Sequence, residues 1–378
     1  MRPIKFLLLM LAVVASLFCG AAMPGNAAAD NLDQLQQKAE QGDAAAQTKL
    51  GLIYVNGQGV SQNYQEAAKW WRKAAAQDYA AAQINLGVMY EKGYGVSQDY
   101  QEAVKWYRQA AEQGNVFAQN ILFSMYDRGK GVPQDYQEAV KWCRQAAAQG
   151  HALAQYNLGL MYYEGRGVQQ NYQEALKWYR LAAKQSLSLA YVNLGFMYEK
   201  GRGVPQDYEE AGKWYRQAAG QGFAAAQYNL GVMCYEGQGV PQSYQEALKW
   251  FRLAAAQGYT DAQYSLGVLY ENAQGVPKNY QEAVKWYRQA AALGNARAQN
   301  NLSSMYCNGQ GVPKDYIECY AWMIVAATNG RVGEAEKQSI EANKQLLQQK
   351  MNSSQIAAAE QRAKEIQAEL ERKKSVAP

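Results

Sequence analysis

Apolar and polar positions repeat every 36 residues along most of this chain. Within one period, residues 224–235 place Ala226, Leu230 and Met233 on one side, at the spacing of an amphipathic helix. A second apolar segment follows after a glycine-rich turn. The pattern predicts two helices per period, and a fixed period in this range indicates stacked supersecondary units.

Eight tryptophans mark the period most clearly, and we expect this column to be buried between the helices. They are Trp70, Trp106, Trp142, Trp178, Trp214, Trp250, Trp286 and Trp322. The register divides the chain into eight repeats, at 43–78, 79–114, 115–150, 151–186, 187–222, 223–258, 259–294 and 295–330. Such a stack grows in one dimension, so chain length sets the number of repeats rather than the number of domains.

The second helix of every repeat carries a capping signal at its start. An Asn, Asp or Ser stands at the N-cap, and a glutamate follows three residues later. The N-cap residues are Asn63, Asp99, Asp135, Asn171, Asp207, Ser243, Asn279 and Asp315. This spacing predicts a capping box, in which each side chain satisfies a backbone donor of the other. We therefore interpret the glutamates as caps and not as catalytic carboxylates.

Two recurring glycines predict how the first helix packs against its partner and how it ends. A glycine recurs inside the first helix, as at Gly231, where it costs about 1 kcal/mol relative to alanine. Its recurrence indicates a close approach of the partner helix, and Phe123 and Ser303 in the same position should change the packing of repeats 3 and 8. Another glycine ends the first helix as a left-handed C-cap. Ala273 replaces it in repeat 7, where we expect strain.

The sequence between residues 226 and 258 carries most of the motif A-x-x-x-L-G-x-x-Y-x-x-G-x-G-V-x-x-D-x-x-x-A-x-x-W-Y-x-x-A-A-x-x-G. This motif resembles the Sel1-like repeat, a relative of the tetratricopeptide repeat. The resemblance implies an all-α fold, an α/α right-handed superhelix of eight helical hairpins with N- and C-terminal capping helices. It further implies an adaptor or ligand-binding scaffold of an exported bacterial type, without a shared enzyme activity.

Both ends of the chain differ from the repeats. Residues 1–29 combine a positive start, an apolar run and small residues before Asp30, which is typical of a signal peptide. Residues 30–42 are expected to form an N-terminal capping helix, and residues 331–378 C-terminal capping helices and a tail. The apolar stripe of that tail predicts docking on the last repeat, with a short coiled coil as the alternative. After signal removal we expect no membrane-spanning segment.

Two cysteines fall in one repeat. Cys307 and Cys319 lie on the two facing helices of repeat 8. A disulfide between them requires Cα atoms within about 7 Å, and an exported protein can form it. Two free thiols are the alternative.

The positions that vary between repeats point to a binding surface. In stacked hairpins we expect the first helices to line the concave side, and exposed apolar patches on such a side mark partner sites. The candidates are Tyr156, Leu160, Tyr163, Phe196, Tyr228, Val232, Tyr235 and Tyr264, flanked by Asn157, Asn193 and Asn229. We expect the tyrosines to lie on the surface and the asparagines to bond a peptide backbone. The alternative is that the position of Leu160 and Val232 packs on the neighbouring first helix.

The sequence shows no catalytic constellation. The chain has one histidine and no Ser-x-x-Lys, Gly-x-Ser-x-Gly or Walker-type phosphate motif. We predict no enzyme activity, no metal site and no cofactor. With 38 basic and 33 acidic residues interspersed along the chain, we also predict no nucleic-acid partner. Because some cysteine-rich relatives are linked to β-lactams, the resemblance leaves β-lactam-binding or β-lactamase-like activity as an alternative.

The predicted function is a non-enzymatic protein–protein interaction scaffold of the bacterial envelope or secreted space. Its partner is a protein or peptide, or a cell-wall glycan, bound on the concave face. We expect a periplasmic or secreted location in a Gram-negative bacterium. The alternative from a different class is a secreted virulence-type factor that binds a host protein of the immunoglobulin type.

Overall fold

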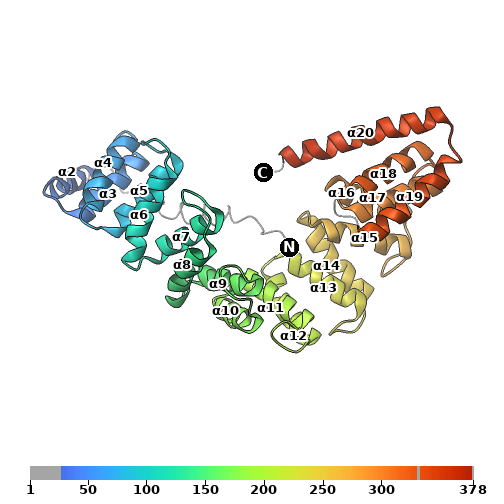
Figure 1. The fold of residues 1–378 in the computed structure, drawn as a ribbon, viewed down its shortest axis with the longest axis horizontal. Helices are drawn as coiled ribbons and strands as arrows, with labels where there is room; N and C mark the ends of the chain where they lie inside the picture. The colour runs from blue at the N-terminus through green and yellow to red at the C-terminus, as the bar shows by residue number, and fades with distance from the viewer. Residues whose placement is uncertain (1–26, 330–332, 377–378) are drawn as a thin grey trace. The chain divides into compact units, whose positions relative to one another are not determined.

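The computed structural model of the protein describes residues 27–329 and 333–376. The predicted signal peptide, residues 1–29, lies outside this part of the chain except for Ala27 to Ala29, where a helix begins. Every regular element of the described residues is an α-helix (Figure 1).

The helices that form the repeats and the ends are α2 (Ala27–Glu40), α3 (Ala44–Asn56), α4 (Tyr64–Ala75), α5 (Ala80–Lys92), α6 (Tyr100–Glu112), α7 (Val116–Arg128), α8 (Tyr136–Ala148), α9 (Ala152–Glu164), α10 (Tyr172–Lys184), α11 (Ser188–Lys200), α12 (Tyr208–Gly220), α13 (Ala224–Glu236), α14 (Tyr244–Ala256), α15 (Thr260–Asn272), α16 (Tyr280–Ala292), α17 (Ala296–Asn308), α18 (Tyr316–Thr328), α19 (Glu334–Gln348) and α20 (Ser353–Val376).

The helices group into two compact units, which we describe separately. The first unit ends at Gln185 and contains repeats 1 to 4, and the second starts at Ser186 and contains repeats 5 to 8. Within each unit, a first helix packs against the second helix of its own repeat and of the repeat before it. Thus α5 packs on α6 and α4, and α13 packs on α14 and α12. This alternation confirms the predicted all-α fold of stacked helical hairpins.

In six of the eight repeats, the close packing of the hairpin depends on an aromatic ring placed against a glycine. A Cβ added at Gly231 on α13 would lie 2.5 Å from the ring of Phe251 on α14, so only glycine fits there. In repeat 3 the sizes are exchanged, because Phe123 replaces the glycine and Cys143 replaces the ring, and both are buried. The other pairs are Gly51 with Trp71, Gly87 with Tyr107, Gly159 with Tyr179, Gly195 with Tyr215 and Gly267 with Tyr287. The predicted close approach of the two helices is confirmed.

The tryptophan column is less buried than the sequence led us to expect. Trp142 is 4% exposed, but the other seven tryptophans are only half-buried. The fully buried column is the next residue along the helix, which includes Trp71, Tyr107 and Tyr215. Neighbouring helix positions point about 100° apart. The residue after the tryptophan therefore faces the first helix, and the tryptophan itself keeps an edge in water.

The second helices have the predicted N-caps, in which the cap side chain accepts hydrogen bonds from the backbone. The second bond of the predicted capping box, from the glutamate side chain back to the cap, does not form. The Asp99 carboxylate accepts hydrogen bonds from the backbone of Gln101 and Glu102, at 2.8 and 3.1 Å. The Glu102 side chain does not return to the cap and pairs with Lys105 instead. The reason is that the backbone N–H of Asp99 already donates to the carbonyl oxygen of Tyr90, at 2.9 Å.

The first helices end in a left-handed residue, as predicted. Gly93 has φ 73°, and its N–H donates to the carbonyl oxygen of Met89. Ala273 adopts the same backbone with φ 57°. A non-glycine residue there costs about 1–2 kcal/mol, because its Cβ crowds a carbonyl oxygen. The expected strain in repeat 7 is thus located at Ala273.

In most repeats a buried glutamine on the first helix bonds to the helix before it, and repeat 5 has Tyr191 at this position. Gln83 donates from Nε2 to the carbonyl oxygen of Ala75 in the preceding repeat, and its Oε1 accepts from Nε2 of Gln113 at 2.8 Å. We call this arrangement the glutamine clamp. The same two bonds surround Gln47, Gln119, Gln155, Gln227 and Gln299. In repeat 7 the donor is missing, because Leu293 takes its place, and Oε1 of Gln263 is buried without a partner.

Additional helices cover both ends of the stack. At the start, α2 packs on α3. At the end, α20 lies along α18 with Ala363 and Ile366 buried, and the Arg362 guanidinium bonds the Glu318 carboxylate at 2.7 Å. The apolar stripe of the tail therefore docks on the last repeat.

The cysteines fall into two groups. Cys307 and Cys319 form a disulfide between α17 and α18, with Cα atoms 5.2 Å apart. Cys143 and Cys234 are free thiols. Burial raises the pKa of the Cys143 thiol, and the nearby Asp127 carboxylate raises it further. The Cys143 side chain is therefore a neutral core residue and not a nucleophile.

Exchanging ring and glycine in repeat 6 tests the hairpin packing. We expect Phe251→Cys to lower the free energy of unfolding by about 3–5 kcal/mol through an unfilled cavity. Gly231→Phe should cost at least about 1–3 kcal/mol through overpacking. The double variant recreates the Phe123–Cys143 pair and should cost less than either single change. Urea unfolding measures the three values, and additive losses would show that the two positions are independent.

Completing the clamp of repeat 7 should stabilise the protein. Leu293→Gln supplies the missing donor to Gln263, and we expect about 1 kcal/mol of added stability because a buried acceptor gains its hydrogen bond. Leu253→Gln is the matched control, since Leu253 and Leu293 are 51% and 49% exposed and Leu253 is on α14. An equal gain from the control in thermal unfolding would assign the effect to the lost surface leucine.

Candidate partner-binding face

We define the first-helix face as the surface formed by the first helices and by the turns that follow them. The structure places every predicted candidate on first helices, and it half-buries nearly all of them. Tyr156, Leu160 and Tyr163 lie on α9 in the first unit. Phe196, Tyr228, Val232, Tyr235 and Tyr264 lie on α11, α13 and α15 in the second unit. They are therefore two separate sets and are treated as such.

The predicted tyrosines are more involved in packing than a free surface requires. The Tyr156 ring lies 5.6 Å from the Tyr179 ring, and the Tyr228 ring lies 5.7 Å from the Phe251 ring. Burial raises the pKa of Tyr228 to about 12, and the Asp261 carboxylate adds to the shift, so the hydroxyl stays neutral. These half-buried rings pack against the fully buried column, which consists of the residues that follow the repeated tryptophans.

The asparagines next to the tyrosines lie beside the buried column. Asn229 donates to the hydroxyl of the buried Tyr215. Asn157 is 3% exposed, and its Nδ2 is buried without a partner, because Cys143 of the preceding repeat provides no hydroxyl. Asn193 is half-buried. The binding of a peptide backbone by these three asparagines stays a prediction.

A row of residues that the sequence analysis missed links neighbouring repeats on this face. The residue between the two glycines of a turn reaches back to the last turn of the previous first helix. Lys130 Nζ lies 2.9 Å from the Glu91 carboxylate, and Arg166 lies 2.5 Å from the Asp127 carboxylate. We call such a pair a junction pair. A separation of 39 residues with complementary charges is the signal that would have revealed it.

The junction pairs differ in their electrostatics. Burial alone would raise the pKa of Glu91, but the hydrogen bond and charge of Lys130, aided by Lys92 and Tyr107, bring it below its ordinary value. For Asp127 burial dominates, and although Arg166 opposes it, the pKa of this carboxyl is raised. Both carboxylates are thus paired with a basic residue of the next repeat.

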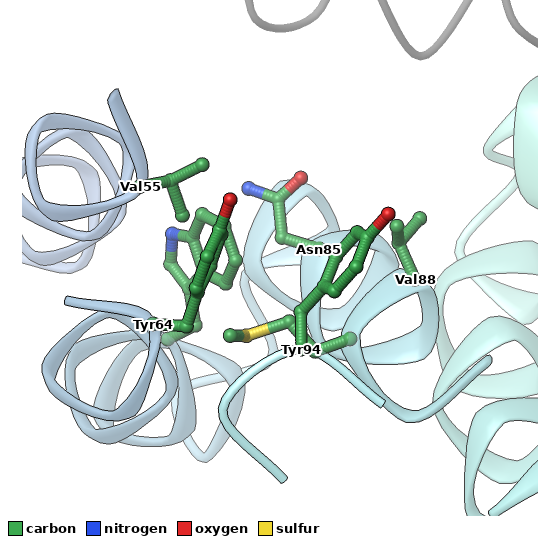
Figure 2. A pocket seen from close by; sticks show the side chains of 7 residues that line it. Val55, Tyr64, Asn85, Val88 and Tyr94 are labelled. Atoms are coloured by element: carbon green, nitrogen blue, oxygen red, sulfur yellow. The ribbon is translucent and has the colours of Figure 1, made fainter. Parts of the chain in front are cut away.

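The first junction of the first unit is a pocket instead of an ion pair (Figure 2). Val55 and Tyr94 occupy the positions that Glu91 and Lys130 take one repeat later. The pocket is lined by Val55, Tyr64, Trp71, Asn85, Val88, Met89 and Tyr94. Because Val55 carries no charge and Tyr94 stacks on Tyr64 with ring centroids 5.3 Å apart, no ion pair closes this opening.

Other kinds of site are not found in the described residues. They contain no cluster of His, Cys, Asp or Glu side chains that would hold a metal ion. Among the same residues, none of the helices has both the length and the hydropathy needed to span a bilayer.

This geometry defines an α-solenoid built from tandem helical hairpins. Comparison with known families identifies the hairpins, because the family model described as "Sel1 repeat" matches residues 44–79, 80–115, 116–151, 152–187, 188–223, 224–259, 260–295 and 296–330. The chain belongs to the Sel1 repeat family. Solenoids of this family commonly serve as scaffolds for protein interactions.

A solved structure agrees with this assignment. The chain is similar to a Sel1 repeat protein from Oxalobacter formigenes, with 35% identity, a TM-score of 0.69, and coverage of 82% of this chain and 90% of that one. It is also similar to c5321, a protective antigen of uropathogenic Escherichia coli with an SLR fold, at 30% identity and a TM-score of 0.43, covering 92% and 97% of the two chains. The comparison with curated proteins found no match.

The ion pair between Glu91 and Lys130 can be tested by titration. In Lys130→Gln the burial of Glu91 is no longer offset, so we expect its pKa to rise, as measured by NMR of the side-chain carboxyl. In the wild type the depressed pKa contributes stability above the unfolded value of about 4.3, and this contribution disappears as pH falls through the folded pKa.

The loss of stability in Lys130→Gln should therefore be present at neutral pH and vanish in acid. Lys105→Gln is the control, because its partner Glu102 sits on the exposed side of α6. A Glu91 pKa that does not move would contradict the assigned role of Lys130.

Proposed function

We propose that this protein is an interaction scaffold that binds a protein partner on its first-helix face. The observation that supports this proposal is a contrast between two sets of residues. The packing residues are the same in most repeats, whereas the junction pairs differ. Ring–glycine pairs, glutamine clamps and helix caps recur from repeat to repeat, with few departures. The junction pairs change from Val55 with Tyr94, to Glu91 with Lys130, and to Tyr235 with Gln274.

Because the junction pairs vary while the packing residues repeat, the junctions differ in what they recognise. Each junction offers a different chemistry at a regular spacing, and a partner that crosses several junctions is selected by their order. Residues of a structural frame have no reason to vary in this way, since their packing partners are the same in each repeat. The variation therefore supports a role of the junction pairs in binding, beyond what each ion pair contributes to stability.

We further propose that the protein acts outside the cytoplasm, in the periplasm or beyond the cell. The composition of residues 1–29 supports this, because it is typical of a signal peptide. The disulfide between Cys307 and Cys319 is compatible with an oxidising compartment. A partner in the cell's own envelope and a host protein are both consistent with this location, and cell fractionation distinguishes them.

Photo-crosslinking tests where the partner binds. A photoreactive phenylalanine replaces Tyr163 or Tyr235 on the first-helix face, and in the controls it replaces Lys141 or Lys249 on the second helices. We expect a protein adduct from the tyrosine positions and none from the lysine positions, whose side chains are 56% and 67% exposed.

The partner identified by mass spectrometry must then bind the purified protein. Adducts from the lysine positions alone, or from no position, would refute binding on the first-helix face. Recovery of the protein only in the cytoplasmic fraction would refute the proposed location.

A further inference from the structure

The single histidine of the chain caps a helix in the first unit. His151 stands at the N-cap of α9, and its Nδ1 accepts a hydrogen bond from the backbone N–H of Ala154 at 3.3 Å. This bond exists only while Nδ1 is unprotonated, because a protonated imidazole has donors on both nitrogens. The cap therefore depends on a group whose charge changes between about pH 5 and pH 8.

The equivalent positions of the other first helices show that the fold does not require a histidine there. Some first helices have side-chain caps that accept hydrogen bonds throughout this pH range, namely Asp43, Asn115 and Asn295. The others begin without a side-chain cap, at Tyr79, Leu187, Phe223 and Tyr259. Among the first helices, only α9 has a cap that responds to mild acid.

The groups that bond or stack around the histidine are uncharged. From α7, the Phe117 ring lies at 79° to the His151 ring, with ring centroids 6.0 Å apart. From α8, the carbonyl oxygen of Ala146 accepts the backbone N–H of His151, and after α10 the Gln185 amide donates to the carbonyl oxygen of Gly150. Burial alone lowers the pKa of His151, and no titratable side chain of the described residues contributes to the shift.

The residue at the position of Phe117 decides whether a protonated cap finds a partner. In repeat 7 the equivalent residue is Asp261, whose carboxylate accepts a hydrogen bond from the Asn295 cap at 3.0 Å. A carboxylate at this place beside His151 would favour the protonated ring and raise its pKa. Phe117 provides no acceptor, so a proton on His151 removes the cap bond without supplying another bond in exchange.

We propose that His151 is a pH switch that weakens the attachment of repeat 4 to repeat 3 in mild acid. Protonation breaks the bond from Ala154, and it places a positive charge at the positive end of the α9 dipole. The first turn of α9 then loosens. The glutamine clamp of this repeat starts in the same turn, because Gln155 bonds the carbonyl oxygen of Ala147 in repeat 3 and accepts from Gln185.

The lowered pKa of His151 sets the pH range of the switch. The contribution of His151 to stability is complete above the unfolded value of about 6.5. It is lost as pH falls through the folded pKa, because the unfolded chain binds the proton more readily than the folded one. This inference goes beyond the proposed function, since it concerns the free protein and requires no partner.

NMR of the untagged protein measures the protonation directly, because the only histidine gives the only imidazole signal. We expect the His151 ring to titrate below about pH 6.5, and the Ala154 amide signal to shift with the same midpoint as its hydrogen bond is lost. Phe117→Asp installs the carboxylate that Asp261 provides in repeat 7, and it should raise the midpoint above that of the wild type. A wild-type midpoint at or above about 6.5, or an Ala154 amide that does not follow the titration, would overturn the proposal.

His151→Asn separates the switch from every other titrating group. Asparagine accepts the cap bond at any pH, as Asn115 does from the N–H of Ala118 at 3.1 Å. Between about pH 7.5 and pH 5, urea unfolding should show the wild type losing about fivefold to tenfold in its folded-to-unfolded ratio relative to the variant, the equivalent of one helix cap. Lys141→Gln, on the exposed side of α8, is the matched control and should follow the wild type.

Amide hydrogen exchange locates the loss. At about pH 5, exchange in α9 should be faster in the wild type than in His151→Asn, while exchange in α5, which begins without a side-chain cap, should be equal in both. Parallel pH dependence of the two proteins in urea, or equal exchange in α9, would overturn the switch. Circular dichroism verifies that each variant is folded, and the wild-type titration of His151 and Ala154 decides the question if His151→Asn is not.

Discussion

The contact between an aromatic ring and a glycine sets the distance between the two helices in six of the eight hairpins. A Cβ added at Gly267 would lie 2.4 Å from the Tyr287 ring, so the first helix comes as close to the second as a backbone without a side chain permits. Only at this distance does the ring reach a fully buried position. The exchange to Phe123 and Cys143 in repeat 3 follows the same volume requirement, with the bulk moved to the other helix.

Once this distance is set, polar groups inside the stack must find partners, because an unpaired buried group is costly. The glutamine clamp meets this requirement between repeats, and the asparagine–tyrosine bond meets it next to the buried ring, as Asn301 and Tyr287 show. Where a substitution removes one partner of such a bond, the other partner is left without a hydrogen bond. This is so for Oε1 of Gln263, because Leu293 replaces its donor. Departures from the repeat therefore indicate where the stack has spare polar groups, and Nδ2 of Asn157 is another such group.

The period, the caps and the glycines made the hairpin fold predictable, because each is a signal within one helix or one turn. The identity of the buried column was not, since Trp70 and Trp71 are adjacent and the choice depends on the angle at which the helices meet. The role of Asn229 was missed for a related reason. A helical wheel places it beside the outward face, but the hydroxyl of Tyr215 from the preceding repeat turns its amide inward.

The junction pairs could not be read from any single helix, because they join residues on opposite sides of a hairpin turn in successive repeats. This position is also the one where a substitution disturbs the frame least, since it follows the end of a helix and reaches only one neighbouring junction. Lys130 and Tyr94 occupy equivalent sites, yet one closes the junction by charge and the other leaves it open. Specificity on this face is thus altered by changing a turn residue and its partner 39 positions earlier, while the ring, the glycine and the clamp remain as they are.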